Sequence, residues 1–262
     1  MKIYISADIE GVTGVSTWRE AADVGLFESR EQMTREVAAA CEGALEAGAT
    51  EIIIKDAHGE GKNLIHSMLP KEVKILSGWS NHPYNMVEGM NEDFDGVIFI
   101  GYHSDALSNA SPLAHTLNPT KIKGVWLNEE PASEFTIHAH VASMLGVPTL
   151  AVSGDGGLIR KVKEFDEQIQ TVVTQEGFGG GIISIHPEVS CEKIKQAISQ
   201  SIAKLADYKP HHIEAFEMKV AFNHHEDAYK YSFYPGAQQV DPFTVVYTGE
   251  DYMELLTFLL FI

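Results

Sequence analysis

Residues 3–14 read IYISADIEGVTG, and this stretch decides the fold. A largely apolar run, typical of a strand buried on both faces, ends in two carboxylates, Asp8 and Glu10. Glycines follow and favour a turn. In an open α/β sheet, ligand sites form at the carboxyl ends of the strands. The stretch therefore predicts both a parallel sheet and a polar site at its edge.

The same arrangement recurs at two later strands. Residues 51–61, EIIIKDAHGEG, place Asp56 and His58 beyond an apolar run, and residues 96–105, GVIFIGYHSD, place His103 beyond another. Carboxylate and imidazole groups are common ligands of divalent metals. Since the ends of parallel strands meet at one edge, we expect a metal site there and a metal-dependent hydrolase.

Spacing supports this hypothesis but leaves alternatives open. Asp8 and Glu10 lie two residues apart, as do Asp56 and His58, and this spacing in an extended segment directs both side chains to one side. An aspartate can bridge two cations, and a metal pair keeps a position open for water. Asp8 or Asp56 is equally well explained as a helix N-cap, and His103 taken singly need not be a ligand.

Two downstream residues are further candidates. His115 lies in SPLAHTLN, a polar loop without ligand neighbours of its own, which suggests acid–base work or contact with a reaction intermediate. Glu134 opens a predicted helix, where the helix dipole stabilises a carboxylate. The alternatives are a solvent-exposed histidine and an ordinary first-turn glutamate. Glu129 and Glu130 are predicted to be loop surface.

The other histidines are expected to have structural roles. His138 and His140, two apart on one helix, point to different faces and are predicted to pack or to lie on the surface. Two adjacent pairs in polar connections are predicted to be solvated, with substrate contact or an interface as the alternative: His211 with His212, and His224 with His225.

Two motifs after the first sheet-like region remain ambiguous. Asp155, after the strand-like LAVSG, is predicted to cap the next helix or to support the site from behind its ligands. Residues 177–181, GFGGG, fit neither the GxxxxGK[ST] nor the GxGxxG pattern, so we expect a flexible or closely packed turn, or a wall of the cleft. HExxH and GxSxG motifs are lacking, which excludes those two hydrolase types.

Composition bounds the partners and the compartment. The 262 residues carry a net charge of -18, which repels nucleic acid and anionic membranes. No apolar run approaches the roughly 20 residues of a spanning helix, and no signal peptide precedes the first strand. The two cysteines, Cys41 and Cys191, have no CxxC neighbour. A cytoplasmic protein is expected.

The order of elements predicts an α/β fold with a mostly parallel sheet and helices on both faces. Helical patterns at residues 30–49 and 133–145 separate the strand-like runs at residues 2–7, 51–55, 73–76, 96–101 and 149–153. After about residue 165, a helix at 187–206, strand-like runs at 215–222 and 243–249, and a helix from Asp251 suggest a smaller α+β lobe. We therefore predict a catalytic domain at 1–165 and a smaller lobe at 166–262.

Several segments together resemble the DppA-type D-aminopeptidases, a family of binuclear zinc peptidases. The matching segments, in order over about the first 160 residues, are MKIYISADIEGVTG, DAHGEGKN, SGWSNHPYNMVEGM, GVIFIGYHSD, AHT, LNEEPASE and VPTLAVSGD. The loop at 104–114 and Ser133, where the family commonly has glycine, depart from the pattern. The C-terminal lobe is only weakly matched.

The resemblance implies a site and an activity. Its metal ligands fall on Asp8, Glu10, His58, His103 and Glu134, with Asp8 bridging two zinc ions, and its catalytic histidine falls on His115. Manganese or cobalt would also suit such a ligand set. The implied reaction removes the N-terminal residue of short peptides, such as D-Ala peptides, in a homo-oligomer, for example a decamer of stacked pentamers.

Two other functions are compatible with the same residues. One is a metal-dependent hydrolase of another amide or of a phosphoester, although few arginines lie near the ligand candidates. The other is a non-catalytic ring assembly that binds metal. The sequence does not specify the D or L preference, the preferred side chain or the metal.

Overall fold

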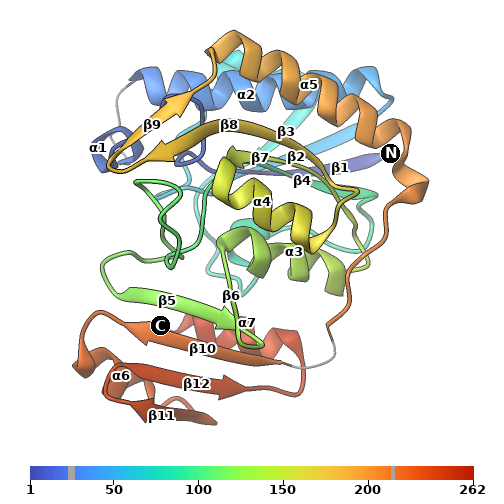
Figure 1. The fold of residues 1–262 in the computed structure, drawn as a ribbon. Helices are drawn as coiled ribbons and strands as arrows, with labels where there is room; N and C mark the ends of the chain where they lie inside the picture. The colour runs from blue at the N-terminus through green and yellow to red at the C-terminus, as the bar shows by residue number, and fades with distance from the viewer. Residues whose placement is uncertain (23–26, 214–215) are drawn as a thin grey trace.

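The computed structural model describes residues 1–22, 27–213 and 216–262, and within them the strands form two sheets (Figure 1). The larger sheet has the order β3-β2-β1-β4-β7-β8-β9 and the smaller has the order β11-β12-β10-β5-β6. The strands of the larger sheet are β1 (Lys2–Ala7), β2 (Glu51–Asp56), β3 (Val73–Leu76), β4 (Gly96–Tyr102), β7 (Thr149–Asp155), β8 (Gln170–Phe178) and β9 (Gly181–Ser184). Those of the smaller are β5 (Ile122–Leu127), β6 (Glu130–Pro131), β10 (Glu217–Phe222), β11 (Ala237–Asp241) and β12 (Thr244–Thr248).

The larger sheet is parallel except at its β9 edge, as the apolar strand runs predict. β1 pairs in parallel with β2 on one side and β4 on the other. Ile3 and Ile5 enter one hydrophobic core, and Tyr4 between them enters the other. This alternation places packed side chains on both faces of β1, so the predicted α/β fold with a covered, mostly parallel sheet is confirmed.

Helices cover both faces of the larger sheet. α2 (Phe27–Glu46) and α5 (Pro187–Ala203) lie together on one face, and α3 (Glu134–Met144) and α4 (Gly156–Phe165) lie on the face toward the smaller sheet (Figure 1). α2 begins and ends about three residues earlier than predicted, and Gly48 with φ +98° follows its end. α5 ends at Ala203, and the 3₁₀ turn η3 (Leu205–Asp207) follows.

The two sheets do not divide at residue 165. β8, β9 and α5 belong to the larger sheet and its cover, whereas β5 and β6 belong to the smaller sheet. β8 pairs in parallel with β7, and β5 pairs with β10 antiparallel, so backbone hydrogen bonding draws each segment across the predicted boundary. GFGGG includes the end of β8, the turn at residues 179–180 and the first residue of β9, and it takes no part in lining the cavity described below.

The smaller sheet carries two helices, α6 (His225–Tyr231) and α7 (Tyr252–Leu260). The polar connection predicted around His224 and His225 instead contains the helix α6, because Ala228 and Tyr231 bury one side of it. The predicted strand at 215–222 is found from Glu217, while Ala215 lies outside the described residues. Shorter turns complete the chain: α1 (Trp18–Ala21), η1 (His66–Met68) and η2 (Asn85–Val87). None of the helices in the described part of the chain is long and apolar enough to cross a membrane.

A buried ion pair joins β2 to the segment before β4. Lys55 Nζ lies 3.1 Å from Glu88 Oε1, and both side chains are almost fully buried. The ammonium also donates to the carbonyl of Gly78 and lies 3.8 Å from the centre of the Trp79 ring. The pair therefore fixes the position of Trp79 beside the end of the sheet.

Glu88→Gln should destabilise the protein by about 3–5 kcal/mol, because it leaves the buried ammonium of Lys55 without its counter-charge. Denaturant unfolding would measure the loss. Glu51→Gln is the matched control, since Glu51 pairs with Lys74 at 2.8 Å on the surface. It should leave the unfolding midpoint unchanged, and an equal loss in both variants would contradict the role given to the buried pair.

Candidate metal centre

The order of the strands brings four candidate residues to one edge of the larger sheet. Asp8 and Glu10 follow β1, His58 follows β2 and His103 follows β4. β1 lies between β2 and β4, and all three run in parallel. The two carboxylates are therefore flanked by an imidazole from each neighbouring strand, at the point where the strand order reverses.

Glycines allow the backbone after β1 to pass close to the end of β4. Gly11 N donates to Gly101 O at 2.8 Å. A Cβ at Gly11 would lie 1.8 Å from Tyr102 O, so no larger residue fits there. Gly101 has φ +72° and a Cβ on it would lie 2.4 Å from Asp8 O. This close crossing holds Asp8 and Glu10 beside His103.

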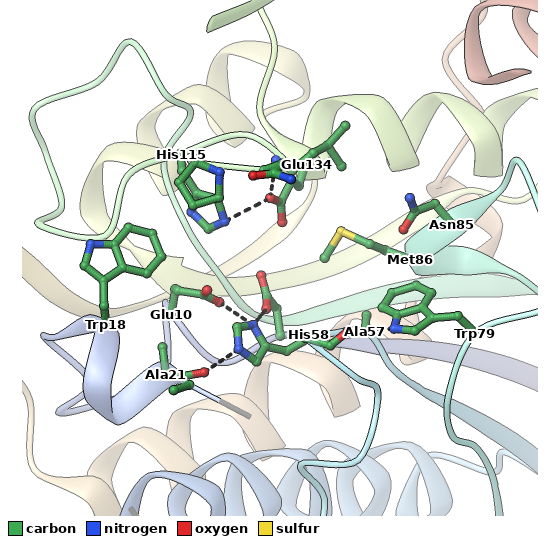
Figure 2. Close-up of a pocket in the computed structure, with 16 residues that line it drawn as sticks. Glu10, Trp18, Ala21, Ala57, His58, Trp79, Asn85, Met86, His115 and Glu134 are labelled. Carbon is green, nitrogen blue, oxygen red and sulfur yellow. Dashed lines mark hydrogen bonds and ion pairs between the residues drawn. The ribbon is translucent and has the colours of Figure 1, made fainter. Parts of the chain in front are cut away.

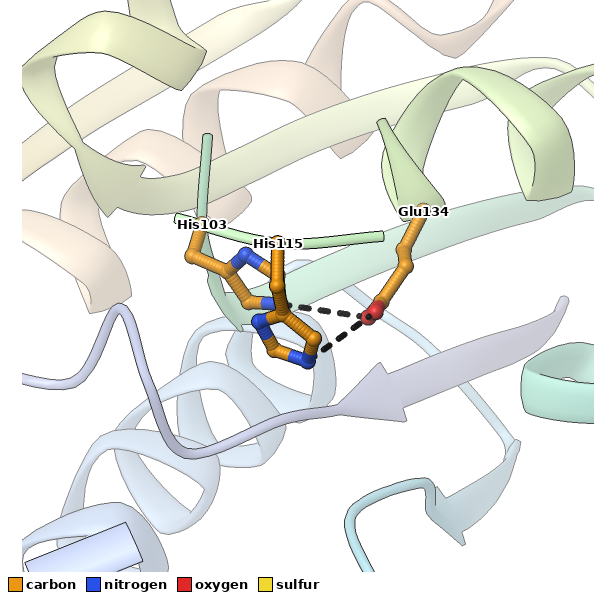
Figure 3. A group of neighbouring side chains, drawn as sticks. All are labelled: His103, His115 and Glu134. Carbon is orange, nitrogen blue, oxygen red and sulfur yellow. Dashed lines mark hydrogen bonds and ion pairs between the residues drawn. The ribbon is translucent and has the colours of Figure 1, made fainter. Parts of the chain in front are cut away.

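Glu134 and His115 reach the same place from the connection that includes β5 and β6. Ser133 caps α3 by accepting a hydrogen bond from Thr136 N at 3.1 Å, and Glu134 occupies the first turn. His115 Nε2 lies 3.5 Å from Glu134 Oε1 (Figure 3). The ring of His115 stacks on that of His103, with centroids 4.2 Å apart. The fold thus gives His115 the ligand neighbours that its own loop lacks.

The carboxylates and imidazoles alternate around the centre. Asp8 Oδ1 lies 3.3 Å from His58 Nδ1, and Asp8 Oδ2 lies 3.5 Å from His103 Nε2. Glu10 Oε2 is 3.0 Å from His58 Nδ1, and Glu134 Oε2 is 3.2 Å from His103 Nε2. Two groups bring ligand atoms within 4.8 Å of one another: Asp8, Glu10 and His103, and His103, His115 and Glu134.

All three imidazoles have one nitrogen bound to a backbone carbonyl and the other directed at carboxylates. A carbonyl only accepts, so the bound nitrogen carries a proton, and the other nitrogen presents a lone pair when the ring is neutral. The pairs are His58 Nε2 with Ala21 O, His103 Nδ1 with Ser104 O at 2.9 Å, and His115 Nδ1 with Leu113 O at 2.9 Å. This tautomer is the one that metal-binding histidines adopt.

Two buried carboxylate oxygens of the centre lack hydrogen-bond partners. Asp8 Oδ2 and Glu10 Oε2 are inaccessible to solvent and accept no hydrogen bond, although His58 Nδ1 lies close to the second. Buried anionic oxygens without donors are costly unless a cation satisfies them. Oxygen and nitrogen donors without sulfur suit zinc, manganese or cobalt. The residues present therefore fit a divalent metal.

The neighbouring carboxylates raise the pKa values of His58 and His103. Burial lowers the pKa of His58, but the charges of Glu10 and Asp8 outweigh burial and raise it to about 12. Burial acts on His103 in the same way, and Glu134 outweighs it, so its pKa also rises. Metal binding would displace these protons, since a metal takes the neutral imidazole.

The pKa values of the carboxylates shift in different directions. Burial and the charge of Glu10 raise the pKa of Asp8. Burial also acts to raise the pKa of Glu134, but His103 and His115 outweigh it and bring the value to about 2. Burial and the charge of His103 lower the pKa of His115. The centre thus holds closely packed negative charge that favours a cation.

A cavity of about 560 Å³ opens above the centre (Figure 2). Trp18 and Trp79 form two of its walls, and Asn85 and Met86 lie near Trp79 (Figure 2). Leu117 also lines the cavity. The ring of Trp18 lies 5.2 Å from that of His115. No lysine or arginine is among the described residues that line the cavity. The sequence patterns did not identify either tryptophan as a lining residue. Metal ligands are recognised by their spacing along the chain, and an isolated aromatic residue has no such spacing.

Asp56 and Asp155 hold the surrounding backbone. Asp56 accepts hydrogen bonds from Asn63 N at 2.6 Å and Leu64 N at 2.8 Å, so it closes the loop after His58 and is neither a ligand nor a helix cap. Asp155 caps α4 by accepting from Leu158 N at 2.9 Å, as one of its two predicted roles requires.

The other histidines considered in the sequence lie outside the cluster of carboxylates and imidazoles described above. His138 and His140 are both buried, so packing is the correct alternative, and burial lowers the pKa of each to about 4. His138 Nδ1 donates to Glu134 O at 2.6 Å and so braces the first turn of α3. His211 pairs with Asp166 at 2.9 Å, and His225 is exposed at the start of α6.

Three comparisons relate the chain to known proteins. A model of a family described as D-aminopeptidase, Peptidase M55, matches residues 1–261. A D-aminopeptidase of Bacillus subtilis (strain 168) is 31% identical over 206 residues, which are 78% of this chain and 67% of that protein. The solved structure of a "Zn-dependent D-aminopeptidase DppA from Bacillus subtilis, a self-compartmentalizing protease" matches with a TM-score of 0.93 and 24% identity, covering 100% of this chain and 96% of that one. At that identity the likeness shows the fold.

Zinc added to chelator-treated protein should raise the thermal midpoint. At a free zinc concentration of 100 times the Kd, binding adds about 2.7 kcal/mol to the free energy of unfolding. His58→Ala should lose most of this shift, since it removes an imidazole that faces Asp8 and Glu10. Differential scanning calorimetry with and without zinc measures the effect.

His66→Ala is the matched control, because His66 is an exposed histidine of the segment after β2. It should keep the full zinc-dependent shift. An unchanged shift in His58→Ala would remove His58 from the centre.

Proposed function

The chain belongs to the D-aminopeptidase family, and from this premise we propose that it is a zinc-dependent aminopeptidase. It releases the N-terminal residue of short peptides, with D-amino acid peptides such as D-Ala peptides as substrates. The Bacillus subtilis relative is named a D-aminopeptidase and the similar solved structure is described as Zn-dependent. These names support the activity and the metal.

The position of Asp8 carries the proposal of two zinc ions. Its two oxygens face different imidazoles, Oδ1 toward His58 and Oδ2 toward His103. Glu10 adds an oxygen on the His58 side, and Glu134 adds one on the His103 side. Each side would then offer two carboxylate oxygens and one imidazole nitrogen, a set of donors that suits a catalytic zinc ion. Asp8 is the bridging ligand in this proposal.

Zinc at this centre supplies Lewis acidity, which polarises a scissile carbonyl and lowers the pKa of water toward neutrality. The protein supplies position and proton transfer. His115 holds its proton at Nδ1 against Leu113 O, so its Nε2 is free to accept a proton on the cavity side. Stacking on His103 and the nearby Trp18 ring fix the plane of this imidazole.

The side chains that line the cavity disfavour a phosphoester as the substrate. Asp8, Glu10 and Glu134 line it, and the described lining residues include no cationic lysine or arginine that would pair with a substrate carboxylate or phosphate. Two zinc ions would offset the charge of these three carboxylates, so it is the lack of an arginine or lysine in the described part of the lining that disfavours a phosphoester. Trp18, Trp79 and neighbouring apolar atoms are then available for the side chain of the first residue.

The proposed enzyme is a homo-oligomer, and a decamer of stacked pentamers is the specific form we propose. The similar solved structure is described as a self-compartmentalizing protease, which supports assembly around an enclosed site. Cys41 and Cys191 are both free thiols, which supports the cytoplasm as the compartment.

Zinc-restored protein should cleave D-Ala-D-Ala faster than L-Ala-L-Ala. N-acetylation of the D-dipeptide should reduce kcat/KM by at least about 100-fold, because it removes the free α-amine that an aminopeptidase binds. Amidation of its carboxyl end should change kcat/KM by less than about tenfold, since no lining cation pairs with that end. Chromatographic detection of released alanine measures all four rates. Equal cleavage of the acetylated and free peptides would refute the aminopeptidase assignment.

His115→Ala should reduce kcat by about 10²- to 10⁴-fold, as expected for loss of an acid–base group. Zinc content, measured by plasma emission spectroscopy after dialysis, should stay at the parent level. Loss of zinc in this variant would instead make His115 a ligand, since its Nε2 lies in one of the ligand groups. His225→Ala, an exposed histidine on α6, is the control.

A further inference from the structure

One backbone carbonyl contacts two histidines of the centre. Ser104 directly follows His103, and its carbonyl accepts a hydrogen bond from His103 Nδ1 at 2.9 Å. The same oxygen accepts from the backbone N of His115 at 3.3 Å. The orientation of this peptide group therefore governs the ring of His103 and the place where the His115 loop attaches.

Asp155 holds Ser104 at two points. Ser104 N donates to Asp155 Oδ2 at 2.6 Å, and Ser104 Oγ donates to Asp155 Oδ1 at 2.5 Å. Asp155 is fully buried at the end of β7, and Oδ1 also caps α4 through Leu158 N. Two bonds to one residue prevent its rotation, and hydrogen bonds to a charged carboxylate are about twice as strong as neutral ones.

Glycines make room for this contact. A Cβ at Gly157 would lie 2.4 Å from Ser104 Oγ and 2.3 Å from the Cβ of Ala110. A Cβ at Gly154 would lie 2.0 Å from Tyr102 O. The turn from β7 into α4 therefore lies against residues 102–104 with no space for side chains between them. A helix cap alone would not require this close approach.

We propose that Asp155 is a positioning residue of the metal centre, acting through Ser104 on His103 and His115. The inference rests on the proposed function only in treating His103 as a metal ligand. Asp155 keeps the Ser104 carbonyl turned toward His103 Nδ1, so that Nε2 faces Asp8 and Glu134. The bond to a backbone carbonyl then fixes both the tautomer and the direction of the metal-facing lone pair.

Asp251 provides a matched control, because it is an N-cap aspartate that serves only α7. Its side chain accepts from Glu254 N at 3.1 Å, and it lies outside the residues that line the metal cavity. Asparagine caps helices about as well as aspartate. Asp155→Asn therefore retains the cap of α4 through its amide oxygen, whereas its amide nitrogen cannot accept the hydrogen bond from Ser104 N that Asp155 Oδ2 accepts. Asp251→Asn loses no contact of this kind.

The test measures zinc affinity of the full-length variants by competition with a chromophoric chelator, without peptide. Asp155→Asn should bind zinc about 10- to 100-fold more weakly than the parent, the usual effect of removing support behind a ligand. Asp251→Asn should bind zinc with the parent affinity. Zinc-free Asp155→Asn should have the lower thermal midpoint of the two, because it leaves the buried N–H of Ser104 without an acceptor, so zinc affinity is measured at a temperature at which both variants are folded.

Ser104→Ala tests the same contact without altering the cap of α4. It removes the hydroxyl and keeps the backbone N–H, so zinc affinity should fall by less than in Asp155→Asn. Parent affinity in both Asp155→Asn and Ser104→Ala would overturn the inference, even if the peptidase is active. A parent that binds zinc but cleaves no peptide would overturn the proposed function alone, since the affinity comparison does not depend on turnover.

Discussion

Burial of three carboxylates at one point is the constraint on which the site depends. Asp8, Glu10 and Glu134 are each almost inaccessible to water, and two of their oxygens accept no hydrogen bond. Negative charge in such a place is stable only beside positive charge. The strands on either side of β1 supply His58 and His103. These two imidazoles face Asp8 from opposite sides, where they would help to hold a cation.

The backbone, more than other side chains, gives the imidazoles their direction. His58, His103 and His115 each give one ring proton to a carbonyl, which belongs to α1 for His58 and to the loop at 104–114 for His103 and His115. A ring fixed at one nitrogen loses little freedom when the other binds a metal or a proton. The site is thus arranged in advance by the crossing of the loops, which in turn requires Gly11 and Gly101 at the point of closest approach.

Sequence reasoning predicted the ligand candidates on strand ends because their positions follow from local rules. A buried parallel strand that ends in a polar residue and glycine indicates where the chain turns, as at Asp8 and His103. It could not distinguish Asp56 from a ligand. The hydrogen bond from Asn63 that occupies Asp56 depends on the path of the loop between them, which the sequence pattern does not show. Membership of β5 and β8 in opposite sheets was missed for a similar reason, since pairing across long separations leaves little local pattern.

The interleaving of the two sheets has a consequence for the centre. The chain leaves the larger sheet after His103, forms β5 and β6 in the smaller sheet, and returns with Glu134 at the start of α3. Leu117 N donates to Glu134 Oε1 at 2.7 Å, so the loop that carries His115 is tied to the same carboxylate. A cation held by Asp8 and Glu134 would therefore join the end of β1 to a segment anchored in the smaller sheet. Metal binding would then stabilise the packing of one sheet on the other, because the ligands belong to both sides of the connection.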